Sequence, residues 1–509
     1  MVLLAVAVVL LAAPVVWALA GAFVGNGGVT LSHFSAVFAG TGRLPVLAIN
    51  SLKVVAGSVA VALTFAVPLA FLCFRTDLPF RRAIIFACLL AACIPLYVTA
   101  TCWMALFGMQ FWLYKTWGSA WISGIAYVPL ATLAVGVSLT SIDRRLEEIA
   151  LLDTGRFGMM IHATLPAAAW GIGMAAAVVA AFSAWDITVT DILTVRTFAE
   201  EVFTQFQLGA GAGNAAAIAF PAMLVLCVLW GLCWLMFRRY AAPVFSSGAL
   251  SPRLFELGWL RYVVLVPVLL CVFGFFLLPL GALVMAVKTP GNLLTAWHTA
   301  QFELLGTLQV TPIAATIAIL IALPLAWAGV RVGRLRLPVA FFVFVLLSVP
   351  APLVGIGLIE MLNRPGLPGA VYDSQAGLVF AYVIRALPFA ILAIIPAIRN
   401  VPRETEEAAE LDGAGWLTKI VSIVLPSGWR SVVVAWLLVF VFSVSEMGAS
   451  FMVVPPGRAT LSTRFFTLIH YGVYPDAAGI CLFLIGIVAL VGGAAALLVW
   501  PGLRRKLGI

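Results

Sequence analysis

The sequence predicts an all-α integral membrane protein with about twelve transmembrane helices, arranged as two tandem six-helix units. Of its 509 residues, 64% are hydrophobic and only 10% are charged, and the mean hydropathy is +1.14. A soluble domain carries about 25% charged residues. Long apolar stretches follow one another along the chain, and landmark residues of the first half recur in the second. Most of the chain is therefore expected to lie in lipid, where a helix pairs its own backbone groups.

About twelve apolar stretches approach the roughly 20 residues that a spanning helix needs. The first has no basic residue before it and exceeds the apolar core of a signal peptide, which is about 7–15 residues long. We therefore expect a retained span there, although a signal peptide is the alternative. The third and ninth stretches contain Pro95, Pro350 and Pro352, so the count could differ by one. The stretches are 2–24, 48–73, 83–107, 120–141, 166–189, 215–237, 259–287, 304–330, 337–361, 376–398, 427–450 and 477–501.

The net charge of +9 follows the expected topology and does not indicate a nucleic-acid partner. With the N-terminus inside, the cytoplasmic loops hold most of the basic residues, which is the positive-inside bias. Both termini are then cytoplasmic, and the partner of the apolar surface is the lipid bilayer. The cytoplasmic basic residues are Arg75, Arg81, Arg82, Arg144, Arg145, Arg156, Arg238, Arg239, Arg253, Arg331, Arg334, Arg336, Arg399, Arg403, Lys419, Arg504, Arg505 and Lys506.

The sequence shows no catalytic or metal-binding constellation. The eight cysteines lie in or beside apolar stretches without paired zinc-site spacing, and the four histidines are scattered. No HExxH motif, nucleophile elbow or phosphate-binding glycine loop occurs. We therefore expect no enzyme activity, no metal site and no cofactor on this chain.

An internal duplication organises the chain. Arg75 and Arg331 are 256 residues apart, and Pro129 and Pro388 are 259 apart. Separations this similar, which drift by a few residues along the chain, indicate a tandem repeat with small insertions or deletions. The expected units are 1–237, with spans one to six, and 261–509, with spans seven to twelve. The polar stretch 238–260, which contains Ser246, Ser247, Gly248, Ser251 and Pro252, is expected to be a cytoplasmic linker.

Each half carries the same polar loop after its fourth span, at 142–166 and 401–426. Asp143 and Pro402 are residue types that begin helices, and the glutamates that follow suit the positive end of the helix dipole. Gly413 can end the second helix. One such helix could merely connect two spans. Two copies at the same topological position favour a docking element for a soluble partner.

The second loop resembles the EAA loop of ATP-binding-cassette (ABC) importer permeases. It reads Glu407-Ala408-Ala409, three residues, Gly413, nine residues, Ile423, one residue, and Leu425-Pro426. The first loop departs from this pattern. It has Ile149 in place of the middle alanine, Thr154 at the glycine position with Gly155 beside it, and one residue fewer before Leu165-Pro166.

The resemblance covers nearly the whole chain and implies two fused type I ABC importer permease domains in a bacterial inner membrane. It implies docking to a homodimeric ABC ATPase, which would bind ATP and Mg²⁺, and delivery of substrate by an extracytoplasmic binding protein. The docking residues carried over are Glu147, Glu148, Ala150, Gly155, Pro166, Glu406, Glu407, Ala408, Ala409, Gly413 and Pro426.

Fused permeases resemble the ferric-iron, thiamine and phosphonate uptake branch. The stretch Glu446-Met447-Gly448-Ala449-Ser450, followed by Pro455-Pro456-Gly457, looks most like its ferric-iron members. Ferric iron is therefore the expected substrate, with thiamine, phosphonate or a polyamine as alternatives. The outer segments 191–214 and 451–476 would receive the binding protein, or could be plain solvated loops.

Asp186 and Glu446 are 260 residues apart, and each lies 20 residues after a Leu-Pro pair, which places them about 30 Å along a helix and near the outer face. They could guide a cationic substrate or form part of a gate, or they could be helix-end carboxylates bonded to a neighbouring loop. Arg385, opposite Ala126 in the repeat, could pair with a carboxylate, contact an anion or snorkel to the interface. Ser183, Ser443 and Ser445 could line the same path or simply pack between helices.

Two further classes of function account for the sequence less well. A secondary transporter can also have twelve spans in two halves, but it has no use for twin docking helices. A membrane-embedded enzyme would need a catalytic cluster, and the sequence shows none. Uptake that persists after the ion gradient is collapsed, while ATP is kept, would separate the ABC importer from the secondary transporter.

Overall fold

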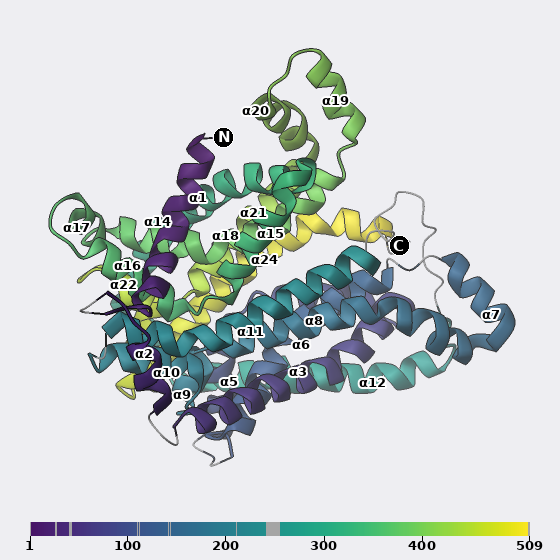
Figure 1. The fold of residues 1–509 in the computed structure, drawn as a ribbon. Coiled ribbons are helices and arrows are strands. Elements are labelled where there is room, and N and C mark those ends of the chain that lie inside the picture. Colours follow the sequence, from purple (N-terminus) through teal and green to yellow (C-terminus); the bar gives the residue numbers. More distant parts are fainter. Residues whose placement is uncertain are drawn as a thin grey trace. The chain divides into compact units, whose positions relative to one another are not determined.

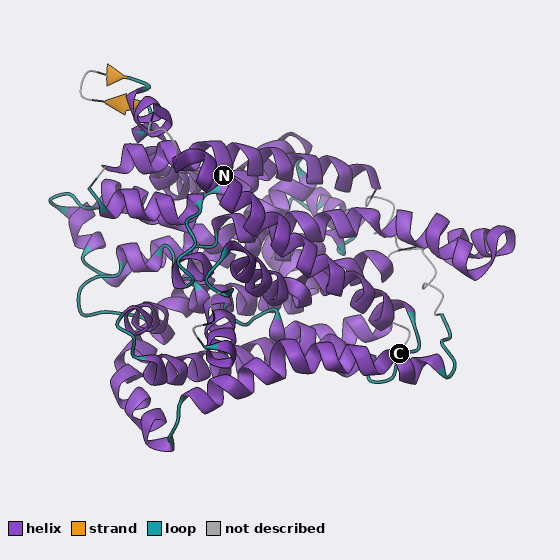
Figure 2. Ribbon diagram, turned by 90° about the horizontal axis from the view of Figure 1, so that it is seen from below, coloured by secondary structure: helices purple, strands orange, loops and turns teal. Residues whose placement is uncertain are grey.

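The computed structural model describes residues 2–25, 28–39, 43–108, 110, 112–140, 142, 144–209, 211–240 and 255–506. In this described part the chain is helical, apart from a small antiparallel hairpin of β1 (Val24–Gly25) and β2 (Gly28–Val29) and an isolated bridge between Thr76 and Phe255 (Figure 2). The all-α class is confirmed. Asp143 and most of the expected linker 238–260 lie outside the described residues.

The helices group into two compact units, each of which is described by itself. The α14 unit comprises Met1–Leu47, Thr197–Cys227 and Val287–Val499, and the α3 unit comprises Ala48–Arg196, Val228–Ala286 and Trp500–Ile509. Helix α11 (Gly211–Tyr240) begins in the α14 unit and continues in the α3 unit.

The α14 unit contains the helices that follow residue 287 together with three from earlier in the chain (Figure 1). They are α1 (Val2–Gly21), α2 (Ser32–Ala39), α10 (Phe198–Gln207), α14 (Pro290–Arg331), the 3₁₀ turn η3 (Gly333–Leu335), α15 (Arg336–Ser348), α16 (Ala351–Leu362), α17 (Leu367–Tyr372), α18 (Gln375–Arg399), α19 (Arg403–Leu411), α20 (Trp416–Lys419), the π turn η4 (Ile420–Val424), α21 (Leu425–Ser445), α22 (Ser450–Val453), α23 (Leu461–His470) and α24 (Tyr474–Lys506).

The α3 unit contains the helices of the first half, joined by two segments from beyond residue 259. They are α3 (Arg43–Arg75), α4 (Arg81–Ala91), α5 (Leu96–Phe107), α6 (Thr116–Thr140), α7 (Arg144–Met159), the π turn η1 (Met160–Thr164), α8 (Leu165–Trp185), α9 (Thr188–Ile192), α12 (Leu260–Val272), the π turn η2 (Phe273–Leu277) and α13 (Leu278–Ala286).

The compact units do not follow the contiguous units expected at 1–237 and 261–509, because the first apolar helix of each half packs with the other half of the sequence. Helix α1 packs on α16, where a Cβ on Gly357 would lie 2.1 Å from the carbonyl oxygen of Pro14. Glycine is therefore required for this close approach. Helix α13 packs on α5, and the ring of Phe275 in η2 lies 4.7 Å from that of Phe65. The sequence boundary between repeats is thus not the boundary between packed units.

Among the described residues, nine helices are long and apolar enough to cross a membrane, and two bent pairs raise this to eleven at most. The bends are 105° between α4 and α5 and 99° between α15 and α16. They fall at Pro95 and Pro350, because proline cannot continue the helical hydrogen bonds. The expected continuous third and ninth spans are therefore broken. In the first stretch, the apolar helix Val8–Gly21 is shorter than the others.

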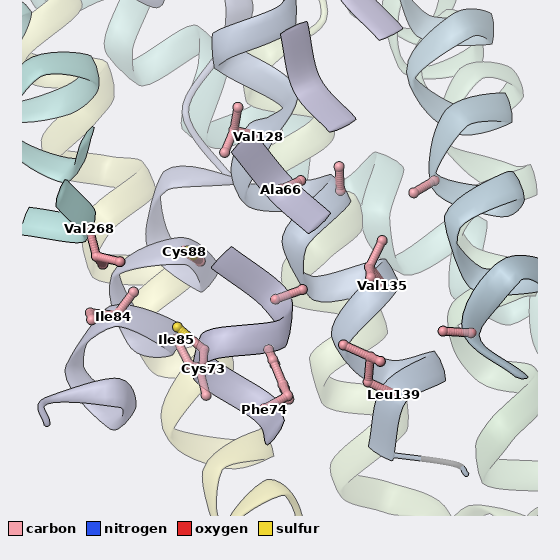
Figure 3. Packing of buried hydrophobic residues seen from close by; sticks show 14 of the residues in the cluster. Ala66, Cys73, Phe74, Ile84, Ile85, Cys88, Val128, Val135, Leu139 and Val268 are labelled. Carbon is pink, nitrogen blue, oxygen red and sulfur yellow. The ribbon is translucent and has the colours of Figure 1, made fainter. Parts of the chain in front are cut away.

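The core of the α3 unit shows how the long helix α3 is held (Figure 3). Ala62, Ala66 and Ala70 recur every four residues and so lie on one face of α3, fully buried. Small side chains allow neighbouring helices to approach closely. Val135 and Leu139 of α6 complete this cluster. The last turn of α3, which ends at Arg75, is thereby fixed against its neighbours.

Candidate functional site: two motif helices and two acidic caps

The motif helix α19 is fastened to the end of the long helix α14 by one buried glutamate. Glu406 lies in the first turn and is 5% exposed. Its Oε1 accepts a hydrogen bond from Nε of Arg331 at 2.7 Å, and its Oε2 accepts one from Trp327 Nε1 at 2.8 Å. Arg331 also donates to the carbonyl oxygens of Ile398 and Val401, at 2.8 and 2.7 Å. The last turn of α14, the end of α18 and the start of α19 are thus joined through one guanidinium group.

The motif helix α7 is fastened in the same way within the α3 unit. Glu147 forms a salt bridge with Arg75, the last residue of α3, and both side chains are fully buried. Thr164 Oγ1 donates to the same carboxylate at 2.8 Å, and Nη1 of Arg75 donates to the carbonyl oxygen of Leu139 at 3.4 Å. Removing one partner of such a buried pair costs about 3–5 kcal/mol, because the other charge is left uncompensated.

The two glutamates of each pair differ in their exposure. Glu147 and Glu406 point inward and are buried, whereas Glu407 and Ala408 are exposed. Glu148, Ala150 and Ala409 are partly exposed. Two large apolar side chains that the motif does not include are also exposed: Leu152 is 87% exposed and Leu411, 259 residues later, is 91% exposed. In Figure 1, α7 and α19 each extend away from the other helices of their own units.

The two loops differ where the motif helix ends. In the second copy, α19 ends at Leu411 and α20 begins at Trp416, with Gly413 at φ 83° between them. In the first copy, Gly155 alone breaks α7, at φ 69° and ψ −175°. Gly155 therefore supplies the left-handed residue that the motif predicts one position earlier. Both loops then continue through a π turn into the next helix, where Pro166 and Pro426 occupy the first turn.

A second contact closes the loop of α19. Nζ of Lys419 lies 2.5 Å from Oε2 of Glu410, so the last residue of α20 is tied back to the motif helix. The lysine side chain is 10% exposed and the glutamate is 68% exposed. In the first copy, Leu151 and Met159 stand at the corresponding positions.

The acidic residues Asp186 and Glu446 each cap a short helix. Asp186 follows α8, and its carboxylate accepts hydrogen bonds from the backbone N–H of Thr188 at 3.0 Å, from Thr188 Oγ1 at 2.6 Å and from Val189 N–H at 3.1 Å. Glu446 follows α21, and its Oε1 accepts from Ala449 N–H at 2.9 Å. Each carboxylate is therefore a helix-end acceptor at the turn after a spanning helix.

Arg385 of α18 distinguishes the second acidic cap from the first. Its Nε lies 3.5 Å from Oε2 of Glu446, and its Nη1 donates to the carbonyl oxygen of Val349 at 2.9 Å. Val349 is the last residue before the bend between α15 and α16. Arg385 therefore ties the broken helix pair to the cap of α21. The corresponding residue in the first copy is Ala126.

The candidate pathway serines lie beside these caps. Ser183 and Ser443 are buried, and their hydroxyls have no hydrogen-bond partner within the described part of the chain. Ser445 donates to the carbonyl oxygen of Val441 at 2.8 Å, which is an ordinary backbone contact within a helix.

Sequence reasoning did not assign a role to Arg75, Arg331 or Trp327, although it found the two arginines as matching landmarks of the repeat. Their similar separation from the motif glutamates was the available signal. An arginine that recurs 72 residues before Glu147 and 75 residues before Glu406 is a candidate partner for both.

Comparison with known proteins identifies the family. The family described as "Binding-protein-dependent transport system inner membrane component" matches residues 314–500. A putative ABC transporter permease protein, ORF1, of Streptomyces antibioticus is 33% identical over 187 residues, which are 35% of this chain and 78% of the relative. The chain belongs to this family of ABC importer permeases.

Other permeases match more of the chain at lower identity. The Fe(3+)-transport system permease protein FbpB 2 of Haemophilus influenzae is 22% identical over 411 residues, which are 78% of each chain. The putrescine transport system permease protein PotI of Escherichia coli is 27% identical over 243 residues, which are 44% of this chain and 86% of the relative. The relatives are transport subunits and not enzymes, and the same holds for this permease. Its apolar helices make it a multi-pass membrane protein. Membership of an ABC permease family also excludes the secondary-transporter hypothesis.

Proposed function

We propose that this permease consists of two fused permease units and imports ferric iron, delivered by an extracytoplasmic binding protein. Ferric iron is proposed as the substrate because the similarity to a ferric-iron permease extends over 411 residues. The fusion is supported by the putrescine permease, of which 86% matches only 44% of this chain. A polyamine is the second candidate, because that putrescine permease is 27% identical to this chain.

The substrate is tested by uptake in cells that express this permease with the ATPase and binding protein that co-purify with it. Accumulation of radioactive ferric iron that depends on ATP, without accumulation of putrescine, is the expected result. Accumulation of putrescine without iron would instead assign a polyamine. Accumulation of thiamine or a phosphonate without iron would assign that compound as the substrate.

The two motif helices are proposed to dock a homodimeric ABC ATPase, which would bind ATP and Mg²⁺, on the cytoplasmic side of the inner membrane. The exposed faces carry this proposal. Leu411, Glu407 and Ala408 form the face of α19, and Leu152 with Glu148 forms that of α7. Both termini would then lie in the cytoplasm, as the distribution of basic residues predicts.

A pair of surface variants tests docking. Glu407→Lys combined with Leu411→Asp should remove most of the ATPase that co-purifies with the permease, because it reverses a charge and removes an exposed apolar contact. Tyr471→Ser, which alters a residue that is 79% exposed at the end of α23, is the matched control and should leave the ATPase bound. Equal ATPase recovery from the double variant and the wild type would overturn the docking assignment.

The pathway assignment of Asp186, Glu446, Arg385, Ser183, Ser443 and Ser445 stays a prediction. The hydrogen bonds of the two carboxylates favour structural roles as helix caps. The buried hydroxyls of Ser183 and Ser443 support polar contacts along a path. Replacing both serines with alanine should reduce uptake without reducing ATPase binding if they line it. Unchanged uptake would remove them from the pathway.

A further inference from the structure

Helix α19 touches the interior of its unit mainly through one side chain. Of its nine residues, Glu406 is the one that is buried, and the others are exposed or partly exposed. The carboxylate accepts from both Arg331 and Trp327, which lie four residues apart on the last turns of α14. A displacement of the exposed face of α19 is therefore carried first to the end of α14.

Helix α14 continues from this contact back to Pro290 as one helical element, with Pro312 and Pro324 inside it. Thr307 and Arg331 are separated by 24 residues, or about 36 Å of helix. Further along α14, the buried Oγ1 of Thr307 accepts a hydrogen bond from the backbone N–H of Leu461 at 2.9 Å. The neighbouring Ser462 donates from its Oγ to the carbonyl oxygen of Glu446 at 3.1 Å. The start of α23 and the acidic cap are thus bonded to the same helix that holds α19.

The α3 unit repeats this arrangement. Arg75 at one end of α3 pairs with Glu147, and Asn50 at the other end donates to the carbonyl oxygen of Arg196 at 3.1 Å, beyond α9. In both units, the long helix joins a motif helix to the segment after the acidic cap. Both halves thus have a hydrogen bond between the long helix and the segment after the acidic cap, although the donor and acceptor groups differ.

We propose that Arg331 with Glu406, and Arg75 with Glu147, are coupling latches through which ATPase movement at the motif helices displaces the long helices α14 and α3. This inference rests on the proposed docking function. Arg331 is a positioning residue in this scheme: it touches neither substrate nor ATPase, and it makes the long helix follow α19. If the pair were purely structural, its loss would lower stability but would not change how the start of α23 responds to ATP.

The test follows hydrogen exchange of the peptide that contains Leu461, in the full complex of permease and co-purified ATPase, with and without ATP and vanadate. In the wild type, vanadate trapping should change the exchange rate at the start of α23. Glu406→Gln should reduce that change by at least about fivefold, the lower end of typical coupling between sites. Glu404→Gln, an exposed residue in the same first turn, is the matched control and should respond like the wild type.

A second variant keeps the proposal testable if Glu406→Gln fails to fold. The double variant Arg331→Met with Glu406→Leu replaces the pair by apolar residues, which is often neutral for stability. It should retain the ATPase but lose the change in hydrogen exchange at the start of α23. A normal response in either folded variant, or no response in the wild type, would overturn the latch. Loss of ATPase from Glu407→Lys with Leu411→Asp tests docking separately, so failure of the two ideas can be told apart.

Discussion

In both motif regions an arginine at the end of the long helix holds a buried glutamate of the motif helix, and this contact is called the anchor. The two regions differ in the turn that follows the motif helix. Arg75 and Glu147 are fully buried, whereas the side chains of Arg331 and Glu406 are 11% and 6% exposed; each glutamate has one further donor, Thr164 for Glu147 and Trp327 for Glu406. The turn after α19 occupies Asp412–Gly415, whereas α7 is broken at Gly155 alone. Within this chain, the acid–arginine contact is therefore retained while the turn changes. This suggests that the anchor constrains each copy more than the exact motif spacing does.

The largest expected effect separates the two anchors. Arg75→Ala should lower the free energy of unfolding by about 3–5 kcal/mol, because it leaves Glu147 buried and unpaired. Arg331→Ala should cost less, since the Arg331–Glu406 pair is slightly exposed whereas Arg75 and Glu147 are fully buried; each glutamate keeps one neutral donor, Trp327 or Thr164. Thermal unfolding of the purified permease measures both.

The control for these two substitutions is Arg75→Met with Glu147→Leu, which removes both charges and should restore most of the stability. A loss that is equal at the two anchors, or larger at Arg331, would contradict this reading of their burial.

The next effect compares the two acidic caps. Arg385→Ala should lower the free energy of unfolding by about 1.5–3 kcal/mol, the range for a hydrogen bond to a charged group. Thr188→Val at the first cap should cost only about 0.5–1.5 kcal/mol, because Asp186 keeps two backbone donors. Denaturant titration of both variants gives the comparison, and a reversed order would show that Arg385 contributes little to the second cap.

A smaller effect is expected at the turns. Gly155 has φ 69° and ψ −175°, a conformation essentially restricted to glycine, so Gly155→Ala should cost about 1–3 kcal/mol. Gly415→Ala is the control within the chain, because its φ is −70° and a Cβ there would meet no atom within 4 Å. Its effect should stay within about 0.5 kcal/mol. Unfolding measurements that show equal losses would remove the conformational argument.

The smallest effect concerns the salt bridge between Glu410 and Lys419, whose positions in the first loop hold Leu151 and Met159. Glu410→Leu with Lys419→Met gives α19 and α20 the residues of the first copy, and the change should cost less than about 1 kcal/mol because Glu410 is largely exposed. Unfolding measured at low and high salt would check this. A loss that is large and independent of salt would show that the pair does more than close the loop.

Several features were predictable because they depend on local residue types. The repeated polar loops gave helices in both halves, whereas the prolines at 95 and 350 put the span count in question without predicting the two bends. The departure of the first copy from the motif at Thr154 and Gly155 was visible in the sequence, but the break of α7 at Gly155 was not predicted from it. The inward direction of Glu147 and Glu406 could not be predicted, because adjacent glutamates are equally polar in sequence, and only the distant arginines distinguish them.

The sequence by itself determined that this chain is a helical membrane protein with a duplicated polar loop, since apolar length and motif spacing are local and repeat along the chain. The tertiary structure decided which residues the repeats pair. It placed α1 with α16 and α13 with α5, across the sequence boundary of the halves. It also joined each motif helix to the end of a long helix through a buried ion pair. Such contacts depend on packing between residues far apart in the chain, which local pattern does not encode.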